Sequence, residues 1–149
     1  DEEMAQIKKL MAFRDYSGGD GGKIESYLLP VLSSMSSGTF EMFDLSLMCN
    51  LMQKQLDGFM VRLMGGWPRD RRLPRHYQEA ALLWSYLNHR SLPADLHVDP
   101  DLAKRYNFFN EQATRAVQNG QGQNADLFRQ SFGDTYWFYF FFVNDMKTV

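Results

Sequence analysis

The sequence predicts an all-α protein of five to six helices, arranged as stacked antiparallel helical hairpins or as an orthogonal bundle. Three observations predict this class. Apolar residues recur with the 3.6-residue period of amphipathic helices along most of the chain. Glycine, proline and asparagine fall between these segments, as expected for short loops that join antiparallel neighbours. Even the aromatic run 136–143 lacks the alternation of apolar and polar residues that indicates a strand.

Start and stop signals bound each expected helix. Acidic residues open the first, and Thr39 is placed to cap a long third helix that the Gly65–Pro68 segment ends. Pro74 suits the first turn of the fourth helix, and Asp99-Pro100-Asp101 combines an N-cap with proline at the first helical position. The glycine-rich segment 17–22 predicts a flexible hinge. The expected helices cover 1–14, 24–36, 40–64, 74–88, 100–118 and 125–145.

Helix 74–88 has the clearest apolar face, formed by Tyr77, Ala80, Ala81, Trp84 and Leu87. Small residues alternate there with large aromatic ones, so a second helix could approach closely and be held between the rings. A helix of this length is not stable alone in water and must be packed by others. We expect this face to be a packing seam for helix 40–64.

The pattern Tyr77-x-Glu79-Ala80-x-x-x-Trp84-x-x-Leu87 resembles the second helix of a tetratricopeptide repeat. The resemblance implies stacked helical hairpins, here the pairs 40–88 and 100–145. The chain departs from that family elsewhere, because helix 40–64 and the connection 65–73 are too long and the Gly-x-x-Tyr element is not in place. Tetratricopeptide-like hairpins are therefore the expectation.

Composition bounds the function. The chain has 149 residues, 44% of them hydrophobic, which suits a single helical domain over 1–149. Its net charge of −2 predicts no nucleic-acid partner. Cys49 is the only cysteine, so no internal disulfide can form, and its place on the apolar face of helix 40–64 predicts a buried structural thiol. No apolar run is long enough to span a membrane.

Three further segments carry a resemblance over the whole chain: Leu73-Pro-Arg-His-Tyr-Gln-Glu-Ala80, Lys104-Arg-Tyr-Asn-Phe-Phe109 and Phe132-Gly-Asp-Thr-Tyr-Trp-Phe138. With them the chain resembles the C-terminal helical part of an uncharacterised Bacteroides-type membrane protein family. The resemblance implies preceding transmembrane helices and supplies no activity. It agrees with a chain that begins Asp-Glu-Glu without an initiator Met, which we expect to be part of a longer protein. Contact with a membrane is expected only through a missing segment, and both a cytoplasmic and a bacterial extracytoplasmic location stay open.

Basic residues crowd the start of helix 74–88, where the helix dipole disfavours cations. One explanation is pairing with Asp70, Glu79 or acids of a neighbouring helix. The other is an anion site, where arginines and helix N–H groups converge on a phosphate or carboxylate. The candidate anion-binding residues are Arg69, Arg71, Arg72, Arg75 and His76.

Signals for catalysis and for metals are incomplete. His76 and Glu79 form a His-x-x-Glu pair, which binds metal only with further ligands from other helices. A zinc site in the segment with His89, Asp95, His97 and Asp99 is the less favoured alternative to a solvated loop. The segment 17–23 lacks the glycine and the Ser or Thr that a phosphate-binding loop needs. We expect no catalytic residue, metal or cofactor.

The best expectation is therefore a helical scaffold or protein-interaction module, whose partner is another protein or the remainder of the same chain. The methionines of helix 40–64 could line an adaptable groove, although core filling is the commoner use. The C-terminal aromatics are either buried or a docking surface; the candidate partner-binding residues are Tyr136, Trp137, Tyr139 and Phe140. The alternatives are an anion-sensing domain of a membrane protein and a hydrolase that uses His76 and Glu79.

Overall fold

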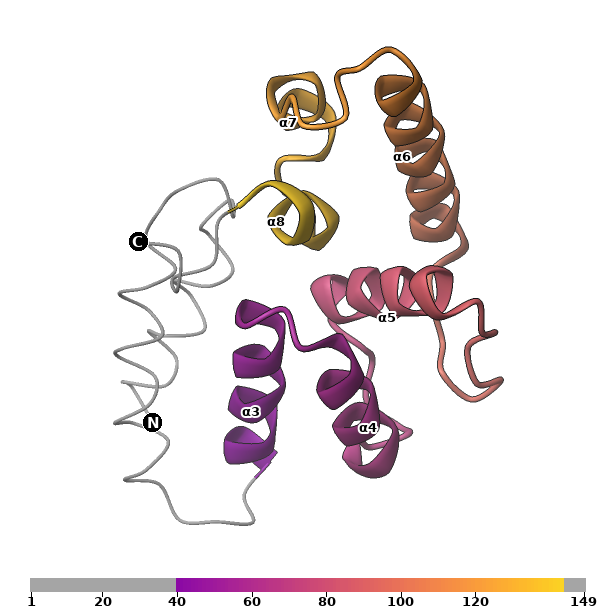
Figure 1. The fold of residues 1–149 in the computed structure, drawn as a ribbon. Coiled ribbons are helices and arrows are strands. Elements are labelled where there is room, and N and C mark those ends of the chain that lie inside the picture. Colours follow the sequence, from indigo (N-terminus) through magenta and orange to yellow (C-terminus); the bar gives the residue numbers. More distant parts are fainter. Residues whose placement is uncertain (1–39, 144–149) are drawn as a thin grey trace. The chain divides into compact units, whose positions relative to one another are not determined.

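The computed structural model describes residues 40–143, which form six helices and no strand (Figure 1). This confirms the all-α class. The helices expected at 1–14 and 24–36, the hinge 17–22 and the end of helix 125–145 lie outside the described residues. Contacts divide the chain into two compact units, and the described residues 40–67 and 143 belong to the first and 68–142 to the second. The expectation of one domain over 1–149 stays a prediction.

The described part of the first unit is an α-hairpin made of α3 (Phe40–Met52) and α4 (Leu56–Gly66). Aromatic contacts close its open end, because the ring of Phe40 meets that of Trp67 edge-on at 5.3 Å and Phe43 lies against Gly66. Leucine, phenylalanine and methionine side chains fill its core: Leu45, Leu47, Leu51, Leu56, Phe59, Met60 and Leu63. Cys49 is half-buried rather than buried.

The expected continuous helix over 40–64 is wrong, because the chain turns at residues 53–55. The N–H of Gln55 donates to the carbonyl of Asn50 at 2.8 Å, and that of Lys54 donates to Leu51 at 3.1 Å. Lys54 takes the left-handed conformation with φ 59°. These are the two hydrogen bonds of a Schellman motif, which usually has glycine at its left-handed position. The side-chain amides of Asn50 and Gln55 join across the turn at 3.1 Å.

The second unit contains α5 (Arg75–Asn88), α6 (Pro100–Gln118), α7 (Asp126–Phe132) and α8 (Tyr136–Phe142). The predicted start of α6 is confirmed, since the Asp99 side chain caps it by accepting from the N–H of Asp101 at 2.9 Å. On α5, Tyr77 and Ala80 are buried as expected, but Leu87 is 42% exposed. Within this unit α5 packs against α6 and α8, so its apolar face serves those helices.

The expected last helix over 125–145 is also wrong, because α7 ends at Phe132 and α8 begins at Tyr136. Thr135 makes this break. Its hydroxyl donates to the carbonyl of Phe132 at 2.7 Å and accepts from the N–H of Phe138 at 3.2 Å, which is the N-cap arrangement for α8. The break lets the two short helices turn separate faces to the aromatic core.

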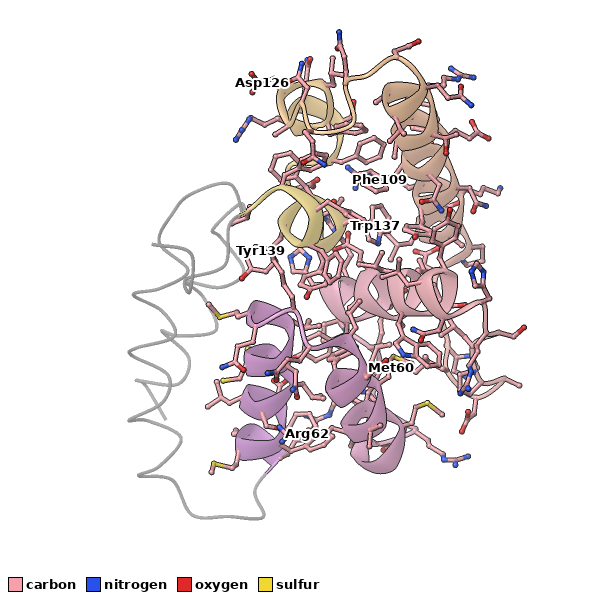
Figure 2. The ribbon with its side chains drawn as sticks, in the orientation of Figure 1. Met60, Arg62, Phe109, Asp126, Trp137 and Tyr139 are labelled. Atoms are coloured by element: carbon pink, nitrogen blue, oxygen red, sulfur yellow. The ribbon has the colours of Figure 1, made fainter. Side chains whose placement is uncertain are left out.

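Aromatic rings form that core (Figure 2). Phe109 of α6 lies 5.8 Å from Trp137 of α8 between ring centroids, and it meets Phe132 edge-on at 5.1 Å. Tyr106 is packed 4.9 Å from Trp137, and burial raises its pKa to about 12, with the nearby Asn110 acting in the opposite direction.

Among residues 40–143, no helix combines the length and the hydropathy that crossing a bilayer requires.

Candidate functional site

Glu79 is the most deeply buried charged residue of the second unit, with no exposed surface. Its carboxylate accepts from Arg75 Nε at 3.1 Å and from the main-chain N–H of Tyr136 at 3.0 Å, and it contacts His76 Nδ1 at 2.8 Å. Its main-chain carbonyl accepts from the indole N–H of Trp137 at 2.8 Å. A buried carboxylate is tolerated when it is paired in this way. Glu79 therefore anchors α8 to α5. Because its side chain is fully buried, a substrate could not reach the carboxylate of the His-x-x-Glu pair in this structure.

Asp134, between α7 and α8, ties two arginines together. Arg75 Nη2 donates to its carbonyl at 2.7 Å and pairs with its carboxylate at 3.0 Å, and Arg105 Nη2 reaches the same carboxylate at 3.1 Å. Burial alone would raise the pKa of Asp134, but the two arginines outweigh it and hold that pKa below its ordinary value. Burial lowers the pKa of Arg75, and the negative charges of Glu79 and Asp134 more than reverse this.

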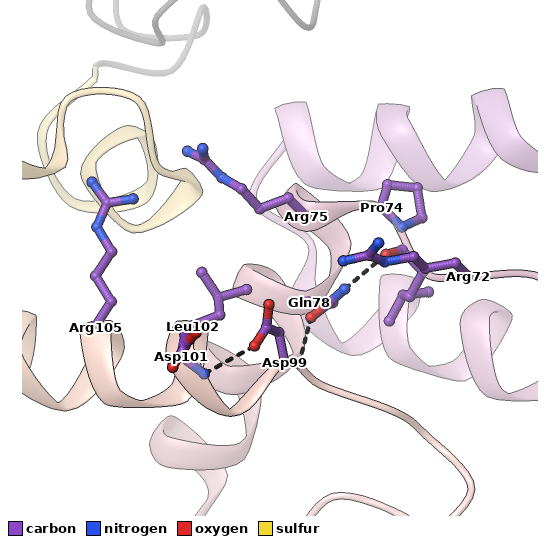
Figure 3. A pocket seen from close by; sticks show the side chains of 9 residues that line it. Arg72, Pro74, Arg75, Gln78, Asp99, Asp101, Leu102 and Arg105 are labelled. Carbon is purple, nitrogen blue, oxygen red and sulfur yellow. Dashed lines mark hydrogen bonds between the residues drawn. The ribbon is translucent and has the colours of Figure 1, made fainter.

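A pocket of about 470 Å³ opens where the starts of α5 and α6 meet (Figure 3). Gln78, which is buried, forms a cross-brace behind it. Its amide N–H donates to the carbonyl of Leu73 at 2.8 Å, and its oxygen accepts from the N–H of Asp99 at 2.8 Å. The brace ties the beginning of α5 to the cap of α6 and so fixes the distance between the two walls. The lining residues are Arg72, Leu73, Pro74, Arg75, Gln78, Asp99, Asp101, Leu102 and Arg105; below, they are called the charged pocket.

The charged pocket gathers two of the five candidate anion-binding residues, Arg72 and Arg75. The others lie apart from it: Arg69 pairs with Asp95 at 3.0 Å, and His76 contacts Glu79. Arg71 is exposed, outside the lining. Arg105 and the acidic wall of Asp99 and Asp101 were not predicted from the sequence. The Asp99-Pro100-Asp101 signal predicted a helix start, and that start also brings two carboxylates to the pocket.

The segment considered for zinc holds no such site. His89 is exposed and takes the left-handed conformation that ends α5, and His97 is exposed as well. In the described part of the chain, no three or more His, Cys, Asp or Glu side chains are grouped so that they could hold a metal ion. The loop is therefore a solvent-exposed connection between α5 and α6.

A second concavity, about 410 Å³, lies between α6 and the α7–α8 segment. None of its twelve lining residues is charged, and large apolar side chains at its edge are open to solvent: Val117 is 68% exposed, Tyr86 52% and Phe141 46%. The lining residues are Tyr86, Phe109, Asn110, Ala113, Thr114, Val117, Gln118, Gly122, Gln123, Phe128, Phe141 and Phe142; below, they are called the neutral groove.

The candidate partner-binding aromatics of α8 lie mostly inside the protein. Tyr136, Trp137 and Tyr139 are at most 5% exposed, and Phe140 is half-buried. Figure 2 shows Trp137 and Tyr139 on α8, with Trp137 directed toward Phe109. The exposed aromatic of α8 is Phe141, which lines the neutral groove.

A family model, described as a family of unknown function (DUF6057), matches residues 1–143. No curated protein and no solved structure matches the chain.

Proposed function

The chain belongs to this family of unknown function, and we propose that its second unit is a protein-interaction module that holds an apolar, uncharged helix of a partner protein in the neutral groove. The observation that carries the proposal is the lining itself: twelve residues without a charge, in a chain in which 23% of residues are charged. An occupant with a charge facing this groove would lose hydration without gaining a counterion.

The edges of the groove provide anchors of the kind that peptide-binding grooves use. Exposed contiguous apolar surface on a small protein is typical of an interaction site. Tyr86, Val117 and Phe141 line the groove with exposed apolar side chains, and a helix with apolar residues at i, i+4 and i+7 could contact them. Side-chain amides of Asn110, Gln118 and Gln123 are available for hydrogen bonds without selecting for charge.

The floor of the groove is rigid, which favours binding. The rings of Phe109 and Phe128 pack at a tilt within the aromatic core, with their centroids 5.7 Å apart, and Phe128 also stacks on Phe142 at 5.0 Å. A preformed surface loses little conformational entropy when a partner binds. This proposal keeps the interaction role expected from the sequence, but it assigns the docking surface to α6, α7, α8 and the end of α5.

We also propose, from the resemblance to the Bacteroides-type membrane proteins, that the module works beside a membrane to which another part of the full-length protein is attached. Fractionation of cells that express the full-length protein tests this part separately. Its recovery in the soluble fraction would contradict the membrane setting and leave the groove proposal unaffected.

The groove is tested by selecting a displayed library of helical peptides against the full chain. We expect the enriched peptides to be uncharged at the positions that contact the protein. Val117→Glu should weaken their binding at least tenfold, because it puts a carboxylate at the edge of an uncharged groove. Asn107→Glu adds the same charge at an exposed α6 position outside the lining and should bind like the wild type. Enriched peptides that bind both variants equally, or no enrichment at all, would contradict the proposal.

A further inference from the structure

The charged pocket has a distribution of charge that the proposed docking role does not use. Three of its residues are arginines, contributed by the segment before α5, by α5 and by α6, and two are aspartates at the start of α6. Figure 3 shows Arg72 extending toward Gln78 on one side of Asp99, whereas the guanidinium groups of Arg75 and Arg105 are directed toward α8. Residues of both signs of charge therefore line one small pocket.

The arginines differ in how far they are already neutralised. Arg75 and Arg105 share the carboxylate of Asp134, and Arg75 also pairs with Glu79. Within the part of the chain that the structure describes, Arg72 has no ion-pair or hydrogen-bond partner. Its planar guanidinium presents a fork of donors suited to a carboxylate or a phosphate. Arg72 is thus the group that is open to an external anion.

The opposite wall is acidic. Asp99 uses one side-chain oxygen to cap α6 through the N–H of Asp101, and the side chain of Asp101 has no partner of its own among residues 40–143. A simple anion would meet these two carboxylates as well as the arginines. A simple cation would in turn meet three arginines. The pocket disfavours a ligand of one sign and favours a ligand that carries both.

Apolar surface also lines the pocket. Leu73 and Leu102 are at most 8% exposed, and with Pro74 they give the pocket a hydrocarbon wall. The cross-brace of Gln78 holds the start of α5 at the cap of α6, so the pocket is already formed without a ligand. A short hydrocarbon link between the charged ends of a ligand would match this arrangement.

We propose that the charged pocket binds a small zwitterion, a molecule with an oxyanion at one end and an ammonium group at the other. The oxyanion pairs with Arg72, beside Arg75 and Arg105, and the ammonium group pairs with Asp101. Free amino acids and aminophosphates such as phosphoethanolamine share this chemistry. The site is independent of the neutral groove, which shares no residue with it.

Isothermal titration calorimetry of the full chain tests the site with γ-aminobutyrate, phosphoethanolamine, butyrate and butylamine. We expect the two zwitterions to bind at least tenfold more tightly than butyrate and butylamine. The order of the two zwitterions tells a carboxylate ligand from a phosphate. Equal binding of butyrate and γ-aminobutyrate would overturn the proposal, as would the absence of heat for all four compounds.

Two variants locate the binding. Arg72→Ala should lose the zwitterions, whereas Arg71→Ala, an exposed neighbour outside the lining, should keep them. Asp101→Asn should bind γ-aminobutyrate more weakly and butyrate more tightly, a reversal of selectivity that a general loss of folding does not produce. Circular dichroism of each variant confirms that it is folded. Unchanged selectivity in a folded Asp101→Asn protein would exclude the proposed ammonium site.

Discussion

The carboxylate of Glu79 on α5 accepts a hydrogen bond from the main-chain N–H of Tyr136, 57 residues later in the sequence, at 3.0 Å. The same oxygen contacts His76, and the other oxygen holds Arg75. The first N–H groups of a helix lack partners within the helix, so a buried acceptor is needed where a helix begins inside a protein. Glu79 supplies that acceptor to α8 from a different helix, and α5 and α8 are therefore joined by more than apolar contact.

Replacing Glu79 should destabilise the second unit strongly. Glu79→Ala leaves the main-chain N–H of Tyr136 without its buried acceptor and removes one of the two carboxylates that hold Arg75. An unsatisfied buried donor costs about 1–3 kcal/mol of unfolding free energy. Glu79→Gln keeps an acceptor oxygen but loses the charge, so its loss should be smaller. Glu111→Ala, at an exposed position of α6, is the control and should change stability little. Urea denaturation measures all three; equal stability of Glu79→Ala and Glu111→Ala would refute the anchoring role.

Gly133, just after α7, should not tolerate a side chain. A Cβ there would clash with the main-chain oxygen of Arg129, so the backbone would have to move. We expect Gly133→Ala to lower the unfolding free energy by about 1–3 kcal/mol, the usual effect of overpacking. Gly65→Ala is the matched change within α4, where a Cβ meets nothing within 4 Å, and helix propensity should make it neutral or slightly stabilising. A thermal melt in which the two variants shift alike would argue against this contact.

The breaks between α3 and α4 and between α7 and α8 could not be predicted from the sequence. Periodicity predicted where the helical segments lie, but the 3.6-residue pattern continues through Lys54 and through Thr135, so it could not show that the chain turns there. At the first turn, a lysine takes the left-handed conformation that glycine usually takes. At the second, Thr135 caps α8, but in the sequence it cannot be told from a threonine inside a helix. Neither site contains proline or a glycine at the decisive position.

The candidate sites show the same limit at longer range. A local cluster of basic residues predicted a site at the beginning of α5, and Arg72 and Arg75 do line a pocket there. Arg105 belongs to the same pocket but lies 30 residues further on, and only the packing of α6 on α5 brings it there. The uncharged lining of the neutral groove likewise comes from separate helices, so no local pattern could reveal it.

Acid should weaken the second unit through Asp134. Its pKa lies below the ordinary value of 3.8, so the stabilisation from its pairing is present in full above that value and is lost as the pH falls through the lower, folded pKa. Asp134→Asn should remove this part of the acid sensitivity. Because the Asp134 side chain is 58% exposed, salt should also reduce the difference between the two proteins. Urea denaturation at neutral and at acidic pH tests the prediction, and parallel acid losses in the two proteins would contradict it.

Removing the hydroxyl of Tyr106 should stabilise the protein. The residue is 4% exposed, and its hydroxyl makes no hydrogen bond of normal geometry in the described part of the chain, although Asn110 lies close enough to act against the rise in its pKa. An unsatisfied buried polar group is costly, so Tyr106→Phe should raise the unfolding free energy by about 1 kcal/mol while the ring contact with Trp137 is kept. Tyr86→Phe removes a hydroxyl from a residue that is 52% exposed and should have little effect. A Tyr106→Phe protein that melts below the wild type would show that the hydroxyl is satisfied in solution.

Replacing His89 with glycine should stabilise the protein. It ends α5 in the left-handed conformation with φ 52°, while its N–H donates to Tyr86 and that of Arg90 donates to Ser85, the hydrogen bonds of a Schellman motif. This conformation costs a residue with a Cβ about 1–2 kcal/mol, and glycine avoids the cost. His89→Gly should therefore raise the melting temperature. His97→Gly, a change of the same residue type in the following loop without a positive φ, should lower it slightly, because glycine gains conformational freedom in the unfolded chain. If both variants melt at lower temperature than the wild type, the His89 side chain contributes more to stability than its backbone conformation costs.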